Sequence, residues 1–423
     1  MSLALLSTPS LHEEEIKRRG YATLFEKHTV FLTGSTGALG AVLLYKLAVQ
    51  VPTHKIYVLI RGSPDLAIQK WKKAMPVQTQ PVLHSRKIHF VVGDMTKPDF
   101  GIDAAVMDEL RQQVTLVIHA AAKITLDADV AEAVENNCLP SLEMAKIASR
   151  FRRLKLFVQV STAYVNSFLP DGHVAEKLYS VGVEVGGKGK EDDPEELLAA
   201  ILRGEGSAYA EHFSSSYTHA KYLMERLMLK RFPTLPMLLV RPTIFGPAVR
   251  DPYPHYAPEN SIPLKRFASL FLMTHGEMQT WHAAEGYDSG ANTLDEMPVD
   301  LVANACLLHA VAGTRGVIHS GSQLYVKTTL DGIMQLADMY APEGMRHALP
   351  TVLFVKDRAT PQCFLADLVK VGSRNWLFDC GRSFWLKQLG GPLSLAACQH
   401  DADRINKQRA TDAWERVLRS VKL

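Results

Sequence analysis

The sequence has few of the features that mark disulfide-bonded, metal-binding, nucleic-acid-binding or membrane-spanning proteins. Only 5 of the 423 residues are cysteine, without a CxxC pair or a Cys/His cluster. This sparse, odd set predicts reduced thiols in a cytoplasmic protein and no metal site. The 47 Lys and Arg residues nearly balance the 44 Asp and Glu residues, so we expect no nucleic-acid partner. No apolar run approaches the roughly 20 residues of a membrane span.

The N-terminus reads as a short helical extension rather than a secretory signal. Its apolar stretch is shorter than a signal core and lacks the preceding positive charge. Ser10 and Glu13 have the spacing of a capping box, which predicts a helix start at this point.

Apolar, β-branched runs alternate with helical stretches through the first 250 residues. Six runs read as buried strands: 29–33, 55–60, 87–92, 114–118, 156–160 and 237–240. Helices are predicted at 41–49, from Pro64 to about Lys73, and at Glu195–Leu202. Continuous apolar strands separated by helices predict a doubly wound α/β fold with a parallel sheet covered on both faces. Its ligand site is expected at the carboxyl ends of the strands.

Three glycines, Gly34, Gly37 and Gly40, stand between the first strand and the first helix. The first permits a tight turn, the second lets backbone approach a pyrophosphate, and the third lets helix and strand pack closely. The helix N-terminus then offers free N–H groups and a positive dipole end to anionic phosphates. At this position the pattern predicts the dinucleotide-binding loop of a Rossmann fold.

The division into domains follows from the same reading. We expect an N-terminal helical extension at 1–28 and an NADP-binding Rossmann domain at 29–250, with a hydrophilic insertion at about 181–206. Residues 251–423 are expected to form a smaller, mostly helical substrate-binding region, with some return of the chain to the Rossmann sheet.

The end of the second strand indicates which dinucleotide binds. A carboxylate there would bind a ribose 2′-hydroxyl, but this chain has Arg61, followed by Lys70. A guanidinium pairs well with a 2′-phosphate, so NADPH is favoured; the alternative for Lys70 is a solvated helix face. Asp94 follows the third strand, where it can accept the adenine amino group, and the small residues Ala120 and Ala121 let backbone pass beneath the cofactor.

Tyr217 and Lys221 place a phenol and an ammonium four residues apart on one helical face. A nearby ammonium and an oxidised nicotinamide favour phenolate, so we expect the pKa of Tyr217 to be lowered. Thr162, at the end of the fifth strand, can share a substrate carbonyl oxygen with the phenol. Asn137 would complete a proton relay through a water and the lysine; the alternative is local hydrogen bonding within its helix.

As an ordered set these residues resemble the extended short-chain dehydrogenase/reductase superfamily, and in detail its branch of fatty acyl-CoA reductases and thioester reductases, the latter found in carboxylic acid reductases and at nonribosomal peptide synthetase termini. The matching stretches are Thr33–Gly40, Val58–Arg61, Gly93-Asp94, Val117–Ala121, Val160–Asn166, Tyr217-x-x-x-Lys221, Arg241–Ile244 and Pro298–Asp300. The long gap between Thr162 and Tyr217 is typical of acyl reductases and not of sugar-nucleotide epimerases.

The resemblance implies an NADPH-dependent reductase of an acyl thioester, acyl-CoA or carrier-bound, giving an aldehyde and, with a second hydride, an alcohol. It implies Thr162, Tyr217, Lys221 and Asn137 as catalytic residues. The residues implied to bind the cofactor are Gly34, Ser35, Thr36, Gly37, Ala38, Leu39, Gly40, Arg61, Lys70, Asp94, Met95, Ala120, Ala121, Lys221, Pro242, Thr243 and Ile244.

The chain departs from the family pattern at several positions. The loop Asp251–Pro258 resembles the acidic, Pro- and aromatic-rich loop of fatty acyl-CoA reductases, with His255-Tyr256 in place of Gly-Trp. Together with the C-terminal third, this loop is expected to build the acyl pocket. Pro140 replaces a usual Gly, and Lys123 a small or hydroxyl residue.

Two other functions fit the same residues. One is an NADPH-dependent aldehyde or ketone reductase of secondary metabolism, which needs no thioester. The other is a nucleotide-binding scaffold without turnover, against which the complete Thr162, Tyr217 and Lys221 set argues. The sequence does not specify an oligomeric state.

Overall fold

The computed structural model describes residues 11–124, 128–185, 192–258, 261–274 and 276–421. Its helices are α1 Leu11–Arg19, α2 Ala22–Phe25, α3 Ala38–Tyr45, α4 Pro64–Ala74, α5 Thr79–His84, α6 Ala104–Gln113, α7 Val130–Ala133, α8 Leu139–Ala148, α9 Val181–Glu184, α10 Pro194–Leu202, α11 Ser216–Arg231, α12 Pro263–Leu272, α13 Val299–Ala312, α14 Leu330–Met339, α15 Phe364–Leu368 and α16 Gln399–Val421. Ser10 of the expected capping box lies outside the described residues.

The strands are β1 Thr29–Thr33, β2 Lys55–Ile60, β3 Ile88–Val92, β4 Leu116–His119, β5 Leu156–Val160, β6 Gly172–Val174, β7 Met237–Pro242, β8 Ile244–Gly246, β9 Met278–His282, β10 Thr293–Leu294, β11 Glu296–Pro298, β12 Gly316–Ser320, β13 Thr328–Thr329, β14 Thr351–Val355 and β15 Trp376–Phe378. Seven of them form one parallel sheet in the order β12-β7-β5-β4-β1-β2-β3. The predicted doubly wound α/β fold is confirmed, and all six expected strands belong to this sheet.

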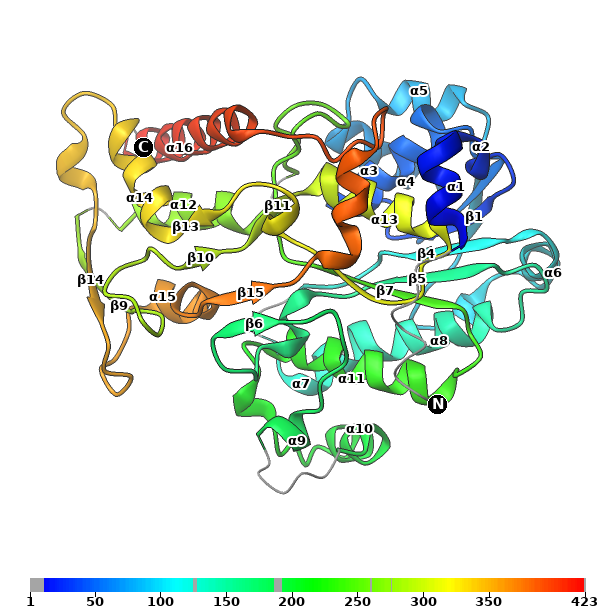
Figure 1. Cartoon of the computed structure of the whole chain (residues 1–423), viewed down its shortest axis with the longest axis horizontal. Helices are drawn as coiled ribbons and strands as arrows, with labels where there is room; N and C mark the ends of the chain where they lie inside the picture. Colours follow the sequence, from blue (N-terminus) through cyan, green and yellow to red (C-terminus); the bar gives the residue numbers. More distant parts are fainter. Residues whose placement is uncertain (1–10, 125–127, 186–191, 259–260, 275, 422–423) are drawn as a thin grey trace.

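Helices cover both faces of the sheet, above and below it in Figure 1. One face packs against α3, α4 and α13 in a continuous apolar core. The other packs against α6, α8 and α11 in a second core. Strands buried on both faces must be apolar throughout, which is why β1, β4, β5 and β7 carry almost no exposed positions.

The chain beyond residue 250 does not form a separate sheet domain. It returns to the main sheet through β12, which pairs in parallel with β7, and through α13, which packs on α3. The remaining strands there form short two-stranded pairs, and a third apolar core gathers α12, α14 and α16, which lie together at the left of Figure 1.

Two contacts tie the far ends of the chain together. The Tyr21 hydroxyl donates to the carbonyl oxygen of Gly390 (3.0 Å) and accepts from the backbone N–H of Leu393 (2.9 Å). Strand β15 pairs with β6, which lies in the long stretch between β5 and α11. Residues near the C-terminus therefore complete parts of the fold that begin much earlier in the sequence.

Candidate active site

The glycine loop joins β1 to α3 and leaves no room for side chains at two positions. Gly34 has φ +77°, and a Cβ there would lie 2.6 Å from the backbone nitrogen of Ala121. A Cβ on Gly40 would lie 2.0 Å from the carbonyl oxygen of Gly34. At Gly37 a Cβ would meet only that same oxygen, at 3.4 Å. The protein thus requires glycine at the first and third positions, whereas at Gly37 the missing side chain widens the adjoining cavity.

The loop also holds a polar atom that lacks a protein partner. Ser35 is buried, and its hydroxyl oxygen has no hydrogen-bond partner among the described residues. The Ser35 carbonyl, by contrast, is fixed by the indole N–H of Trp71 (3.1 Å). A glycine-rich turn and an unsatisfied hydroxyl, both at the N-terminus of α3, fit a bound phosphate.

A cavity of about 430 Å³ opens at the carboxyl ends of β1, β2, β3 and β4. It is lined by ten residues predicted to bind the cofactor: Gly34, Ser35, Thr36, Gly37, Arg61, Lys70, Asp94, Met95, Ala120 and Ala121. Ala38, Leu39 and Gly40 form the buried first turn of α3 behind the loop. Sequence reasoning did not assign Thr96, Glu135 or Asn136, which line the same cavity.

The charged groups of this cavity have different surroundings. Arg61 and Lys70 are exposed at its rim. Hydrogen bonds from the backbone and hydroxyl of Thr96, together with nearby Arg61, lower the pKa of Asp94 below its ordinary value. Asp94 is therefore an anionic acceptor, as its predicted role toward an amino group requires.

His119 supports the cavity floor. Its Nδ1 shares a 2.7 Å hydrogen bond with the Thr33 hydroxyl oxygen, which also accepts from the backbone N–H of Ala121. Burial lowers the pKa of His119 to about 3, so the ring is neutral near pH 7. Its contacts fix the segment facing Gly34, which is a structural role.

Tyr217 and Lys221 lie in the first two turns of α11, which starts at a capping box formed by Ser215 and Thr218. The Lys221 ammonium lies 5.9 Å from the centroid of the Tyr217 ring and donates to the carbonyl oxygen of Val160 (3.1 Å). Burial lowers the pKa of Lys221 to about 8. The lysine is thereby anchored at the end of β5, beside the segment that carries Thr162.

Thr162 follows β5 directly. Its hydroxyl oxygen accepts from the backbone N–H of Tyr164 (3.3 Å) and caps a short 3₁₀ turn, Ala163–Asn166. Among the described residues no acceptor takes the Thr162 hydroxyl proton, which leaves that proton for a ligand.

The expected lowering of the Tyr217 pKa is not found in the protein alone. Burial raises the pKa of this phenol above its ordinary value, because the low-dielectric surroundings disfavour phenolate. Tyr217 is therefore a protonated hydrogen-bond donor, while its side chain remains partly accessible.

Asn137 lies in a π-helical turn, Val134–Cys138, between α7 and α8. Its amide oxygen accepts from the N–H of Lys123 (2.9 Å), and its amide nitrogen donates to the carbonyl oxygens of Lys123 (3.0 Å) and Ala133 (3.1 Å). Both amide protons are used in these bonds. The bond to Ala133 corresponds to the local alternative within the helix, whereas the two bonds to Lys123 fix the loop after β4. The proton relay through Asn137 stays a prediction.

The Asp251–Pro258 loop packs against the helix that follows the glycine loop. Lys46 (2.7 Å) and Gln50 (2.6 Å), from the π-helical extension of α3, donate to the Asp251 carboxylate. The Tyr256 hydroxyl donates to the carbonyl oxygen of Ala38 (3.3 Å). A contribution of this loop to the acyl pocket stays a prediction.

Asp300, in the matched Pro298–Asp300 motif, explains how that loop is held. Its carboxylate accepts from the backbone N–H groups of Val249 (3.0 Å), Arg250 (2.9 Å) and Asp251 (3.2 Å). The motif therefore acts as a backbone clamp.

The last predicted cofactor residues, Pro242, Thr243 and Ile244, pass from the end of β7 into β8. The Thr243 backbone N–H donates to the carbonyl oxygen of Ser320 (3.1 Å). None of the three lines the 430 Å³ cavity, so their contact with a cofactor stays a prediction.

The described residues were compared with the requirements of a metal site and of a membrane-spanning helix. No group of three or more His, Cys, Asp or Glu side chains in the described part of the chain is arranged to hold a metal ion. Likewise, none of the helices that the structure describes combines the length and apolarity of a membrane span. All five cysteines are free thiols.

Comparison with known proteins identifies the family. Residues 32–306 match the model of an NAD-binding family described as male sterility protein, and the chain belongs to that family. It is 26% identical over 302 residues to fatty acyl-CoA reductase 1 of Gallus gallus, covering 68% of this chain and 55% of the relative. It is 29% identical over 244 residues to human fatty acyl-CoA reductase 2, covering 55% of this chain and 46% of the relative. The chain thus spans about half the length of these curated relatives.

Solved structures agree on the fold. The terminal R domain of the myxalamid PKS-NRPS pathway aligns with a TM-score of 0.62 at 17% identity, covering 91% of both chains. The reductase domain of a nonribosomal peptide synthetase from Mycobacterium tuberculosis gives 0.58 at 17% identity, covering 92% of this chain and 95% of the other. The family match and these relatives confirm the predicted resemblance to fatty acyl-CoA reductases, and the solved structures confirm the predicted fold.

Proposed function

We propose that the protein is an NADPH-dependent reductase that converts an acyl thioester to an aldehyde, with a second reduction giving the alcohol. The observation that carries this proposal is that the Lys221 ammonium lies 5.9 Å from the Tyr217 ring and donates to Val160 at the end of β5, two residues before Thr162. A neutral phenol and a free hydroxyl are the donors that a carbonyl needs when it accepts electrons.

The cradle at Gly34, Ser35 and Gly37 would hold the pyrophosphate of the dinucleotide. Preference for the phosphorylated form is supported by Arg61 and Lys70, cations at the rim near the end of β2. When bound, NADPH supplies a hydride to the carbonyl carbon.

The chain's own residues then act on the carbonyl oxygen. Tyr217 and Thr162 donate hydrogen bonds to the negative charge that develops there. In the first reduction the oxyanion collapses and the thiolate leaves, giving an aldehyde. In the second reduction Tyr217 gives its proton to the alkoxide, and the Lys221 ammonium stabilises the phenolate left behind.

The test is NADPH oxidation with a panel of acyl-CoA, acyl-carrier and free-aldehyde substrates. We expect turnover on a thioester, with aldehyde or alcohol identified as product. Turnover on aldehydes alone would make the protein a carbonyl reductase, and binding without turnover on any substrate would make it a scaffold; either result overturns the proposal.

Tyr217→Phe removes the hydroxyl donor, and we expect kcat to fall by about 10²–10⁴-fold while NADPH affinity is retained. Tyr340→Phe is a matched control, because Tyr340 caps the C-terminal end of α14, its ring lies under the Lys407 ammonium, and its hydroxyl has no hydrogen-bond partner among the described residues. It should leave kcat at the wild-type level. Full activity of Tyr217→Phe would rule out this catalytic site.

A further inference from the structure

A second cavity, of about 240 Å³, lies beside the N-terminus of α11. Its lining residues come from widely separated parts of the chain: Ser167, the segment 211–214, His282, Gln362, and the segment that holds Lys370 and Arg374. The Ser214 backbone N–H donates to the Ser167 hydroxyl oxygen (2.9 Å). Ser167 closely follows Thr162, and Ser214 closely precedes Tyr217. The cavity thus joins the two segments that carry the proposed catalytic groups.

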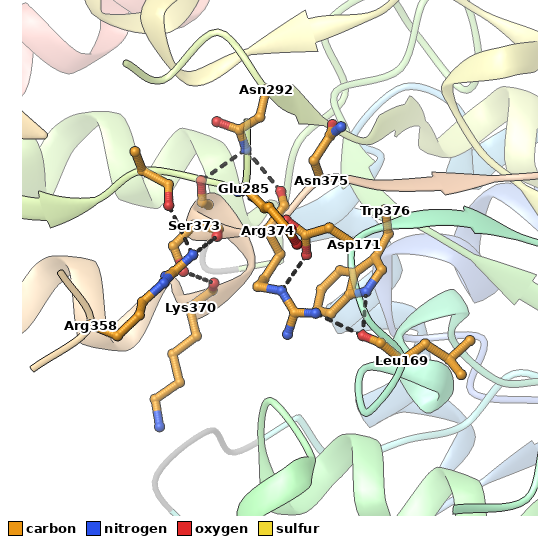
Figure 2. Close-up of polar contacts among 12 residues, drawn as sticks. Leu169, Asp171, Glu285, Asn292, Arg358, Lys370, Ser373, Arg374, Asn375 and Trp376 are labelled. Atoms are coloured by element: carbon orange, nitrogen blue, oxygen red, sulfur yellow. Dashed lines mark hydrogen bonds and ion pairs between the residues drawn. The ribbon is translucent and has the colours of Figure 1, made fainter. Parts of the chain in front are cut away.

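Arg374 is held rigidly at the wall of this cavity (Figure 2). Its Nε donates to the Asp171 carboxylate (2.5 Å), and one terminal nitrogen donates to the carbonyl oxygen of Leu169 (2.7 Å). The guanidinium also lies 4.4 Å from the centroid of the Trp376 ring. Among the described residues the other terminal nitrogen has no hydrogen-bond acceptor, so a fixed cation keeps free donors for a ligand.

Lys370 supplies a second charge at the cavity. It is exposed, and its ammonium has no acceptor or ion-pair partner in the part of the chain that the structure describes. The Ser373 hydroxyl donates to the Lys370 carbonyl oxygen (2.9 Å). Figure 2 shows the Lys370 side chain extending away from this hydrogen bond. A lysine without a carboxylate partner beside a fixed guanidinium is suited to an oxyanion.

A further cation, Arg358, lies next to this cavity. Arg358 donates to the carbonyl oxygens of Ala283 (2.8 Å) and Ser373 (3.2 Å), so it flanks the same backbone as Arg374 (Figure 2). Together with Glu285 and with Lys356, whose ammonium pairs with Asp288, it lines a neighbouring cavity of about 340 Å³.

Few carboxylates oppose the cations of the 240 Å³ cavity. Glu211 is the carboxylate among the residues that line the 240 Å³ cavity, and it is exposed. Asp171 lies behind Arg374, and His212 and His282 add two imidazoles. The donors that face the cavity therefore outnumber its anionic acceptors.

We propose that this cavity binds the phosphate of the phosphopantetheine arm that presents the acyl thioester, with Lys370 and Arg374 as its charged contacts. The inference rests on the proposed function and names the part of the substrate that is recognised. The arm places a phosphate at a distance from its sulfur, and the cavity is smaller than the roughly 300–1,000 Å³ that encloses a whole ligand. It therefore suits one section of a long arm. Coenzyme A and acyl carrier proteins both present this phosphate.

The experiment compares acyl-phosphopantetheine with acyl-pantetheine, which differ by the phosphate alone. For the wild type we expect a KM about 10-fold lower with the phosphate present, the effect of one charge-assisted contact. Lys370→Ala should reduce this ratio toward one. Lys387→Ala, an equal charge change on the exposed 3₁₀ segment Gly381–Gln388, should preserve it. Arg374→Lys, which keeps the charge but loses the fork that binds Asp171 and Leu169, provides a second variant.

Each result decides between defined alternatives. Equal KM values for the two wild-type substrates, or equal loss on both in Lys370→Ala, overturn the phosphate site and leave thioester reduction standing. Absence of turnover on every thioester overturns the proposed function itself. Acyl-CoA and an acylated carrier protein then distinguish the source of the phosphate: a Lys356→Ala loss confined to acyl-CoA would assign the outer cavity to the nucleotide end of coenzyme A.

Discussion

The cofactor half and the C-terminal half of the molecule are held together in different ways. The first is a seven-stranded parallel ladder buried between two layers of helices. The second has only two-stranded pairs among its described residues, apart from the one strand it lends to the main sheet. Its segments are positioned by long-range contacts between side chains and backbone. A backbone ladder tolerates many sequences, whereas a polar contact depends on individual side chains.

The ion pair between Glu296 and Arg409 is an example of these long-range contacts in the C-terminal half. Their 2.6 Å ion pair joins β11 to α16, and both side chains are less than a tenth exposed. Two further nitrogens of Arg409 are buried without a partner among the described residues. Such a pair adds little net stability, yet losing one member leaves an uncompensated buried charge.

The largest effect is expected from Glu296→Gln, which leaves the Arg409 charge buried and unpaired. We expect a loss of about 3–5 kcal/mol in the free energy of unfolding, with NADPH binding retained because it depends on the other half. Tryptophan fluorescence in urea reports on this region, since four of the five tryptophans (Trp281, Trp376, Trp385 and Trp414) lie there. Glu205→Gln, which breaks an exposed pair with Arg203, should leave the midpoint unchanged. Joint loss of NADPH binding and C-terminal structure would show that the halves unfold as one unit.

The next effect concerns Lys221, a buried charge in the cofactor half. Because its pKa is lowered to about 8 in the folded chain from an ordinary 10.5, the unfolded chain binds the proton more readily. The free energy of unfolding contributed by this group therefore falls as the pH drops from about 10.5 to 8, by about 3 kcal/mol, and stays level below that. Lys221→Met should abolish turnover and remove this pH dependence, measured as the difference between variant and wild-type unfolding curves. An unchanged difference across that range would contradict the assigned burial.

The smallest effect concerns the 2′-phosphate at the rim of the cofactor cavity. Arg61→Ala should reduce the preference for NADPH over NADH about 10-fold, the equivalent of about 1.4 kcal/mol, in titrations of both dinucleotides. Lys70 and Lys72 form a matched pair on α4, because Lys70 lines the cavity and Lys72 does not. Lys70→Ala should weaken NADPH binding and Lys72→Ala should not; equal behaviour would return Lys70 to a solvated helix face.

The same division determines what the sequence could predict. The six strands, the glycine loop and the cations near β2 follow from short-range patterns. The structure places the glycine loop, these cations and the ends of four of the strands around one cavity. Helix and strand ends differ from expectation by a few residues, as at α3, which starts at Ala38 and continues as a π-helical turn at Lys46–Gln50. The residues at which helices and strands end depend on tertiary contacts, such as the hydrogen bond from Lys46 to Asp251.

Three features could not be read from local patterns. The seventh strand, β12, lies far along the chain in a stretch of mixed helices and strands. The packing of the Asp251–Pro258 loop against α3 is the second feature. The composition of this stretch indicates a loop, but it does not indicate the surface on which the loop packs. The raised pKa of Tyr217 depends on burial by segments distant in sequence, which the four-residue spacing to Lys221 does not report.

The bonds between Tyr21 and the backbone of Gly390 and Leu393 have a consequence for synthesis on the ribosome. Strand β7 of the main sheet pairs with β12, and β6 pairs with β15, and both partners are synthesised much later. While only the glycine loop and the first six strands of the sheet have emerged from the ribosome, β7 is an edge strand without its partner β12. Tyr21 therefore gains these two partners only after residue 393 has been synthesised.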